Sequence, residues 1–388
     1  MEFESILFEL VVIFSGVAIL ATLFLFLKQP IIIAYIVMGM LVGPFGARVI
    51  SRADHIEQIS HLGIILLLFL IGLNLHPDKL LTLFRKAVVV TCATSLVFFT
   101  AFCAITLAFG FPVMESIIVG IALMFSSTIV GLKLTPTTTL HQRHLGEVMV
   151  SVLLLQDILA ILIILFLEGS TKPELYIYIP LLILKGTGLV VFSFLFFKFC
   201  LMRLFNKYDT IQEYLLVMAL GWCLIISGAA EALGMSYEIG AFIAGCSFAL
   251  SPISLVISER LKPLREFFLI LFFFATGAQF DLLQLKEVVI PGLVLAGVIV
   301  IIKPLIFTRA FRLSHEETRI AGELGFRLGQ ASEFSLLVTY MALTSAVISN
   351  RTAYLIQLTT VITFIVSTYI VTGKFTTPIA SDKALRAD

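Results

Sequence analysis

Charged residues are scarce in this sequence. Asp, Glu, Lys and Arg make up 13% of its 388 residues, whereas hydrophobic residues make up 60%. Soluble globular domains carry about a quarter charged and about half apolar residues, so this composition excludes that class. The formal net charge of +1 gives no argument for nucleic acid or for acidic ligands. The composition therefore predicts a protein that crosses a lipid bilayer several times.

Cysteine patterns and catalytic motifs are missing as well. The five cysteines lie within apolar runs without CxxC spacing, so neither a disulfide framework nor a zinc site is predicted. The glycines form neither GxGxxG nor GxxxxGK[ST], and His315–Arg319 lacks the second histidine of a zinc-protease helix. No TVGYG-like filter occurs, which argues against a potassium channel of the usual kind. We expect no enzyme and no cofactor.

Long apolar runs are what the sequence has instead. Runs bounded by charged residues or by Pro and Gly predict an all-α membrane protein of about thirteen transmembrane helices. The predicted spans are residues 5–27, 30–47, 58–76, 86–110, 113–134, 144–168, 174–203, 212–234, 236–252, 262–281, 286–311, 317–346 and 350–373. The first run lacks a basic start and a small-residue cleavage pattern, so it is predicted to be retained.

Basic residues predict the orientation. Three of the 26 lie within spans, five lie on the side of the N-terminus and eighteen lie on the other side. Lys and Arg accumulate in cytoplasmic loops. We therefore expect the N-terminus outside and the C-terminus in the cytoplasm, in a multi-pass protein of the inner (plasma) membrane.

An internal repeat is visible between the third and tenth predicted spans. Phe69–Asn74 and Phe274–Gln279 share the pattern F-x-x-G-x-[NQ], and Phe274 follows Phe69 by 205 residues. The tenth span comes seven positions after the third. Because seven is an odd number, the second copy must enter the membrane from the opposite side. Inverted repeats of this kind are typical of secondary transporters. We predict one transmembrane transport domain over 1–388, with repeat 1 at about 5–168, a linking helix at about 174–203 and repeat 2 at about 212–373.

One carboxylate stands in the middle of an apolar run. Asp157 lies within the run from about Leu145 to Leu167, which is long enough to cross a bilayer as a helix. A low-dielectric site favours the protonated form of a carboxylate, so Asp157 is poised to exchange a proton for a cation if water reaches it.

Other polar groups fall at similar depth. The hydroxyls of Ser126–Thr128 satisfy either a helix interruption or a neighbouring helix, and the sequence does not separate these two roles. Lys303 needs an intramembrane partner, and either Asp157 or Glu333 is a candidate. Arg327 has a partner at helical spacing in Glu323, which is most simply structural. Of the weaker acids, Glu147, Glu231 and Glu238 are expected at span edges, and Lys185 is expected to snorkel.

Four segments carry a resemblance to a known family. They are Ile33–Gly46, Leu62–Leu75, Leu155–Ile158 and Gly329–Phe334. In this order they resemble the membrane domain of monovalent cation/proton antiporters, and within these the Kef-type potassium/proton group. The Gln156–Asp157 pair is the most specific mark.

The resemblance implies a sodium/proton antiporter-like fold. It implies a homodimer in the lipid bilayer, in which each protomer has a dimerisation part and a mobile six-helix core. Two crossed broken helices would lie in 113–134 and 317–346, and the core would move like an elevator. Carried over by position, the ion- and proton-binding residues are Asp157, Gln156, Ser127 and Thr128, and the core charges are Lys303 and Glu333.

Two departures from the Kef pattern are visible. Kef-type proteins commonly continue into a cytosolic nucleotide-binding domain, and none is predicted here, which leaves gating by nucleotide or glutathione unsupported. Regulation by a separate subunit stays open. Glu238 stands where an apolar or small residue is expected.

The resulting hypothesis is antiport. Asp157 would hold either H⁺ or one monovalent cation, with K⁺ expected before Na⁺. Gln156 supplies a carbonyl but no proton, so one-for-one, electroneutral exchange is predicted. The alternatives are a Na⁺/H⁺ antiporter that uses the same site and a gated cation channel.

Overall fold

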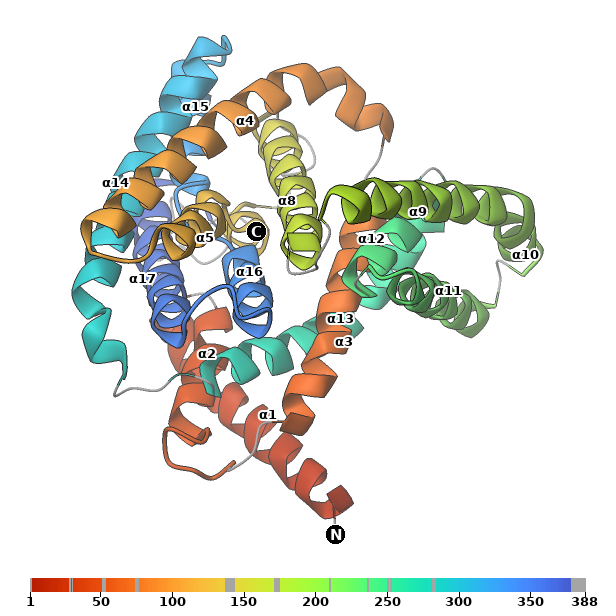
Figure 1. Ribbon diagram of the computed structural model, residues 1–388, viewed down its shortest axis with the longest axis horizontal. Helices are drawn as coiled ribbons and strands as arrows, with labels where there is room; N and C mark the ends of the chain where they lie inside the picture. The colour runs from red at the N-terminus through yellow and green to blue at the C-terminus, as the bar shows by residue number, and fades with distance from the viewer. Residues whose placement is uncertain are drawn as a thin grey trace. The chain divides into compact units, whose positions relative to one another are not determined.

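The regular elements in the described part of the chain are helices. The computed structural model describes residues 2–27, 29, 31–50, 54–73, 77–136, 144–170, 175–208, 211–235, 237–249, 251, 253–278, 280 and 284–377. The α-helices are α1 (Glu2–Phe26), α2 (Ile31–Val42), α3 (Asp54–Leu73), α4 (Pro77–Ala108), α5 (Val113–Met124), α6 (Thr128–Lys133), α8 (His144–Ser170), α9 (Leu175–Phe196), α10 (Met202–Lys207), α11 (Gln212–Ala232), α12 (Tyr237–Phe248), α13 (Ile253–Ala278), α14 (Val289–Leu313), α15 (Thr318–Arg327), α16 (Glu333–Thr344) and α17 (Asn350–Lys374) (Figure 1). A π-helical stretch, Phe197–Leu201, joins α9 to α10, and a 3₁₀ turn, Gln284–Glu287, precedes α14.

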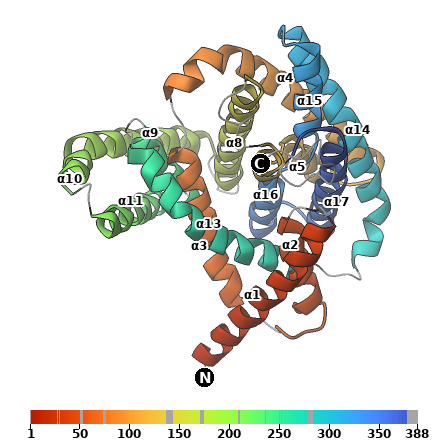
Figure 2. The same cartoon turned by 180° about the vertical axis from the view of Figure 1, so that it is seen from behind.

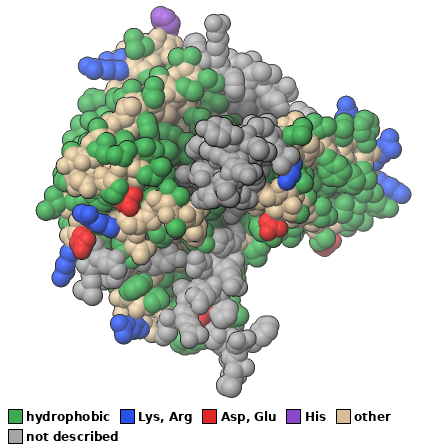
Figure 3. All heavy atoms as spheres, viewed as in Figure 1, with side chains coloured by type: hydrophobic (Ala, Val, Ile, Leu, Met, Phe, Trp, Pro, Cys, Tyr) green, Lys and Arg blue, Asp and Glu red, His purple; other side chains and the backbone are tan. Residues whose placement is uncertain are grey.

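Several of these helices have membrane dimensions. Among the described residues, six stretches are long and apolar enough to span a bilayer: Ile6–Phe26, Ala87–Ala108, Leu184–Lys207, Glu213–Ala232, Val289–Leu313 and Asn350–Lys374. Four shorter apolar helices accompany them. On the face in Figure 3, hydrophobic side chains cover most of the described surface and charged ones are few. The all-helical membrane fold is thus confirmed, while the count of thirteen spans stays a prediction.

Two predicted spans have edges that differ from the observed helices. α4 begins at Pro77 and α13 at Ile253, nine residues before the predicted spans at 86 and 262. Charged residues were taken as the ends of these spans, but a helix continues through charges that face water. In α13 the ammonium of Lys262 lies 3.7 Å from the carboxylate of Glu259, one turn earlier, and both side chains are exposed.

Two other predicted spans are interrupted in the structure. The span 113–134 consists of α5 and α6, with a break at residues 125–127. The span 317–346 consists of α15 and α16, with a break at residues 328–332. These are the two spans in which broken helices were predicted.

The chain divides into two compact units. Unit 1 contains Met1–Ala53, Leu83–Ala160 and Thr276–Asp388, and unit 2 contains Asp54–Thr82 and Ile161–Ala275. Each unit takes segments from both predicted repeats. In unit 1, α14 packs against α15 and α17, and α16 packs against α5 and α17, although α5 is far from the others in sequence (Figures 1 and 2).

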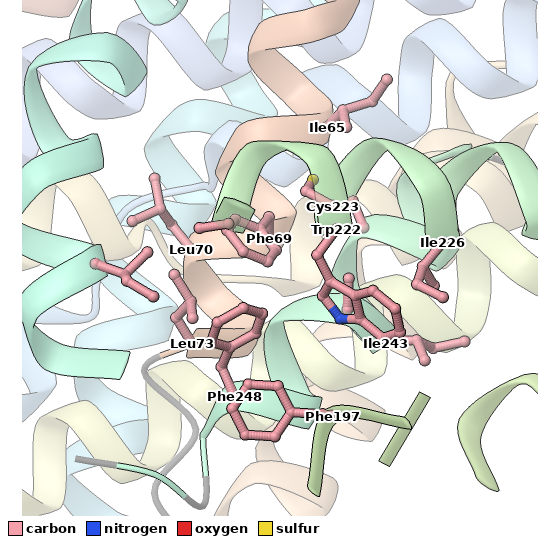
Figure 4. Close-up of a cluster of buried hydrophobic side chains, with 14 of the residues drawn as sticks. Ile65, Phe69, Leu70, Leu73, Phe197, Trp222, Cys223, Ile226, Ile243 and Phe248 are labelled. Atoms are coloured by element: carbon pink, nitrogen blue, oxygen red, sulfur yellow. The ribbon is translucent and has the colours of Figure 1, made fainter. Parts of the chain in front are cut away.

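Unit 2 is built around an aromatic cluster. Phe69 of α3 and Phe197 of the π-helical stretch both meet Phe248 of α12, with ring centroids 5.9 and 4.5 Å apart (Figure 4). Trp222 of α11 lies in the same cluster and donates from Nε1 to Ser247 at 3.1 Å. Lipid is as apolar as these side chains, so close packing rather than exclusion from water holds the helices together.

Two glycine contacts repeat along the chain. A Cβ added at Gly72 of α3 would lie 2.5 Å from the carbonyl oxygen of Phe242 in α12. A Cβ added at Gly277 of α13 would overlap the carbonyl oxygen of Ile36 in α2. Gly277 follows Gly72 by 205 residues, and Phe242 follows Ile36 by 206. The same close approach between helices therefore occurs twice at the spacing of the predicted repeat. Asn74 and Gln279, which end the repeated pattern, lie outside the described residues.

Candidate functional site

The first helix break uses one of its own serines as a cap. α5 ends at Met124, the next residue, Phe125, has an extended backbone with a ψ of 156°, and α6 starts at Thr128. The hydroxyl of Ser127 accepts a hydrogen bond from the amide of Val130 at 3.0 Å. The amide of Ser126 donates to Oε1 of Gln156 on α8 at 2.9 Å. Of the two roles left open for these hydroxyls, both occur: Ser127 satisfies the helix interruption, whereas the hydroxyls of Ser126 and Thr128 bond to neighbouring segments.

The second break is held from α17. Ser332 caps α16, and its side chain accepts from the amide of Phe334 at 3.1 Å. The amide of Ala331 donates to the hydroxyl of Thr363 at 3.1 Å, and Ser367 donates to Oε1 of Gln330 at 3.2 Å. Thr363 and Ser367 are four residues apart on one buried face of α17. The hydroxyl of Thr363 satisfies a backbone amide that a continuous helix would satisfy internally, and Ser367 holds the side chain of Gln330.

The two breaks bind each other directly. The hydroxyl of Ser126 donates to the carbonyl of Leu328 at 2.8 Å. Nε2 of Gln330 reaches the carbonyl oxygen of Ser127 at 3.4 Å. Non-helical backbone at membrane depth is stable only where protein or water satisfies it, and here each break satisfies part of the other.

Lys303 bridges the same two breaks. Its ammonium, fully buried on α14, donates to the carbonyl of Phe125 at 2.6 Å and to the carbonyl of Gln330 at 3.1 Å. It also lies 5.4 Å from the ring centroid of Phe98 and 6.0 Å from that of Phe102. Carbonyls at a helix C-terminus carry partial negative charge, which stabilises a cation there.

This arrangement differs from the pairing expected for Lys303. Among the described residues no ion pair joins Lys303 to Asp157, whose carboxylate meets the hydroxyl of Thr128 instead. Backbone carbonyls freed by the breaks take the place of a carboxylate. The sequence does not show these carbonyls, because every residue has one and only the fold decides which ones lose their helical partner.

Asp157 lies on α8 beside the first break. Its side chain is 1% exposed, and the hydroxyl of Thr128 is 3.2 Å from each carboxylate oxygen. Thr128 is the first residue of α6, so the end of the break and the carboxylate form one site. Glu333, the first residue of α16, is 5% exposed.

The predicted site residues thus come together in unit 1, and each makes a different contact. Asp157 and Thr128 are in contact, Gln156 holds the break from the neighbouring position, and Ser127 caps α6. Sequence reasoning had singled out the hydroxyl of Ser126, but it missed the parts of Gln330, Thr363 and Ser367, which also hold the breaks. Polar residues at helical spacing in an apolar span are the pattern that would have identified the last two.

The remaining polar groups of the sequence lie elsewhere. The pair predicted between Arg327 and Glu323 is confirmed, with nitrogen–oxygen distances of 2.7 and 2.9 Å. Glu147 and Glu231 are exposed. Lys185 donates to the carbonyl of Leu233 at 3.1 Å and so caps α11. The side chain of Glu238 lies outside the described residues.

Comparison with known proteins places the chain. Residues 12–380 match the family described as "Sodium/hydrogen exchanger, transmembrane". The chain belongs to this family. It is a membrane transport protein of the monovalent cation/proton antiporter family, and the resemblance to the Kef-type membrane domain is confirmed.

Individual relatives of the chain differ in their named cargo. The K(+) efflux antiporter 5 of Arabidopsis thaliana is 28% identical over 373 residues, which are 92% of this chain and 64% of the relative. The chain therefore spans less than two thirds of that protein. The iron transporter MagA of Paramagnetospirillum magneticum is 24% identical over 348 residues, 88% of this chain and 80% of MagA.

The fold also has a solved counterpart. The sodium proton antiporter MjNhaP1 from Methanocaldococcus jannaschii superimposes with a TM-score of 0.68, covers 95% of each chain and is 17% identical. At this identity the likeness concerns the fold, so the chain shares the NhaP1-like helical architecture.

Proposed function

We propose that the protein exchanges one monovalent cation, K⁺ before Na⁺, for one H⁺ across the inner (plasma) membrane, without net movement of charge. The observation that carries this proposal is the buried carboxylate of Asp157, which meets the hydroxyl of Thr128 where two helix breaks bind each other. Intramembrane acids beside interrupted helices mark the ion sites of secondary transporters.

Asp157 is the shared site in this mechanism. An ionised carboxylate without a bound cation is costly in a low-dielectric interior. The empty, charged site therefore stays open to water on one side of the membrane and does not cross. Binding of H⁺ or of a cation neutralises the carboxylate and allows the site to change sides. Thr128 contributes a hydroxyl oxygen to the cation and a hydrogen bond to the empty carboxylate. The two guests compete, and this competition produces exchange.

The neighbours of Asp157 support one-for-one stoichiometry. Gln156 does not titrate, and its carbonyl oxygen is engaged with the amide of Ser126. Lys303 is engaged with two backbone carbonyls, so it is not released from Asp157 when a cation binds. We assign Glu333 the part of a fixed core charge that acts on Asp157 through space. One carboxylate that carries one positive guest at a time gives electroneutral exchange.

The wider architecture belongs to the same proposal. Thirteen membrane helices in inverted repeats, an elevator movement of a core against a dimerisation domain, and a homodimer are expected from the family resemblance. The distribution of basic residues supports an external N-terminus and a cytoplasmic C-terminus.

The choice of cation separates two antiporter hypotheses. K⁺ is favoured by the Gln156–Asp157 mark and by the name of the Arabidopsis relative. Na⁺ is the cargo named for the solved structure of similar fold. A gated channel is the remaining alternative, and it would conduct cations without moving protons.

Reconstitution in sealed vesicles tests the proposal. We expect an imposed K⁺ gradient to drive a change of lumenal pH, a Na⁺ gradient to drive a smaller one, and Asp157→Asn to abolish both. Coupled exchange that survives in Asp157→Asn would refute the site.

A matched control comes from the same helix. Glu147 is exposed in the first turn of α8, so Glu147→Gln removes a carboxylate without touching the site and is expected to leave exchange intact. Asp157→Glu keeps the charge and lengthens the side chain by one methylene, so it is expected to retain coupling at a reduced rate. Cation flux without a pH change in the unmodified protein would favour the channel.

A further inference from the structure

Arg327 uses every hydrogen-bond donor that it has. Its side chain is 1% exposed, and an arginine carries five N–H groups. Nε and Nη2 donate to Glu323 at 2.9 and 2.7 Å, and Nη2 also donates to the carbonyl of Thr376 at 2.8 Å. Nη1 donates to the carbonyl of Leu134 at 2.8 Å and to the hydroxyl of Thr135 at 3.1 Å. Neutralising Glu323 alone requires only two of these five bonds.

The acceptors come from three different segments of unit 1. Glu323 lies one turn earlier on α15, Leu134 directly follows α6, and Thr376 follows α17. Arg327 itself is the last residue of α15, so the second helix break begins at the next residue. One guanidinium therefore holds the end of the first broken helix, the start of the second break and the segment that leaves the last helix.

The short helix α6 links the contact between Arg327 and Leu134 to the ion site. α6 has six residues and is about 9 Å long, since an α-helix rises 1.5 Å per residue. Thr128, at its first turn, contacts Asp157, while Arg327 holds Leu134 just beyond its other end. A helix this short moves as a rigid piece, so a shift at Leu134 displaces the hydroxyl of Thr128.

The segment after α17 is packed onto the same place. The ring of Phe375 lies 5.8 Å from the guanidinium carbon of Arg327 and, centroid to centroid, 5.8 Å from the ring of Phe326. The ammonium of Lys374 lies 4.4 Å from the centroid of Phe326. Thr377 is fully buried. We call Phe375–Thr377 the exit segment.

We propose that Arg327 is a positioning residue for the cation site, and that the exit segment is part of the transport machinery through it. This inference rests on the proposed function, because it takes Asp157 and Thr128 as the site. Arg327 sets the depth of α6, and hence of the Thr128 hydroxyl, relative to Asp157. Displacement of the exit segment removes one of its five hydrogen bonds and loosens that setting.

Arginine is required for this role, and lysine is not equivalent. A lysine keeps the positive charge next to Glu323 but offers three donors from one point, whereas the planar guanidinium reaches acceptors on three segments at once. Arg327→Lys therefore separates charge balance from positioning.

The test measures cation binding without depending on transport. Purified protein in detergent is titrated with K⁺, and the rise of its thermal unfolding midpoint gives the half-saturating concentration. We expect this concentration to rise about tenfold in Arg327→Lys, since a misplacement of about 1 Å costs up to roughly a hundredfold at a binding or reacting group. Arg319→Lys, an exposed arginine on the same helix, is the matched control and should match the unmodified protein. A folded Arg327→Lys with unchanged half-saturation overturns the inference.

A double variant guards against a folding defect. Glu323→Gln with Arg327→Met removes both charges, so no buried charge is left unpaired. If Arg327 serves only to balance Glu323, this variant regains the unmodified half-saturation, which also overturns the inference. If Arg327 positions α6, half-saturation stays raised in the double variant, because the carbonyls of Leu134 and Thr376 still lack their donor.

The exit segment is tested in the same assay. Phe375→Ala, which removes the ring beside Arg327, should shift half-saturation in the same direction as Arg327→Lys but by less. An unshifted Phe375→Ala next to a shifted Arg327→Lys would overturn the part assigned to the exit segment. Vesicle exchange of the unmodified protein is measured separately, so failure of the antiport proposal shows there and not in this comparison.

Discussion

Competition at a single carboxylate makes the pH dependence of transport quantitative. The perturbation is pH on the cation-binding side, and the quantity is the cation concentration that gives half-maximal exchange. Asp157 is the one titratable group in the contact that we assign to the cation, because Gln156 and Thr128 do not titrate. Where protons occupy most sites, one cation must displace one proton. The half-saturating concentration should therefore fall tenfold for each unit by which the pH rises. This change corresponds to about 1.36 kcal/mol of binding free energy.

Thr128 affects the half-saturating cation concentration at a given pH, but not how steeply that concentration changes with pH. Its hydroxyl, 3.2 Å from each carboxylate oxygen, can donate one hydrogen bond to the ionised form. Hydrogen bonds to charged groups are worth about 1.5–3 kcal/mol, and the long distance favours the lower end. In Thr128→Val protons should compete better, so half-saturation at a given pH should rise by about tenfold, since about 1.4 kcal/mol is a factor of ten. The slope should stay at one decade per pH unit.

The assay is exchange in vesicles whose external pH is stepped while K⁺ is varied. A slope near zero would mean that protons and cations do not compete, and the shared site would be refuted. A slope near two decades per pH unit would mean that a second acid titrates with Asp157. Glu333, the buried acid at the start of α16, would then be the first candidate for that second acid, and one-for-one exchange would be wrong.

Two further predictions concern stability, measured as the free energy of unfolding in a detergent titration. Gln156→Met removes the acceptor of the Ser126 amide and should cost about 1–3 kcal/mol. Gln156→Glu keeps an oxygen at this place and should cost less at low pH. Equal losses in the two variants would refute the role of that hydrogen bond. Gly277→Ala places a methyl group against the backbone of Ile36 and should cost about 1–3 kcal/mol. Gly297→Ala, in an open stretch of α14, should stabilise the protein by roughly 0.5–1 kcal/mol. Equal effects of the two substitutions would refute the close approach at Gly277.

The burial of Asp157 could be predicted from the sequence, because membrane depth is a property of the local sequence. An apolar run of sufficient length must cross the bilayer as a helix, and a carboxylate at its centre is costly wherever the helix packs. The same reasoning located Lys303 and paired Arg327 with Glu323, since helical spacing makes residues four apart neighbours. The paired glycine motifs likewise predicted a repeat, and at its spacing Gly72 and Gly277 each lie close to the backbone of another helix.

The partners of these groups were decided by tertiary structure. Lys303 binds carbonyls 178 and 27 residues away, and Ser126 binds one 202 residues away. Every residue has a carbonyl, so no residue type marks the ones that a helix break leaves unsatisfied. Only the meeting of the two breaks makes those carbonyls available, and this is why Lys303 has backbone partners where the sequence suggested a carboxylate. The sequence by itself determined which buried polar groups need compensation, and the fold determined what compensates them.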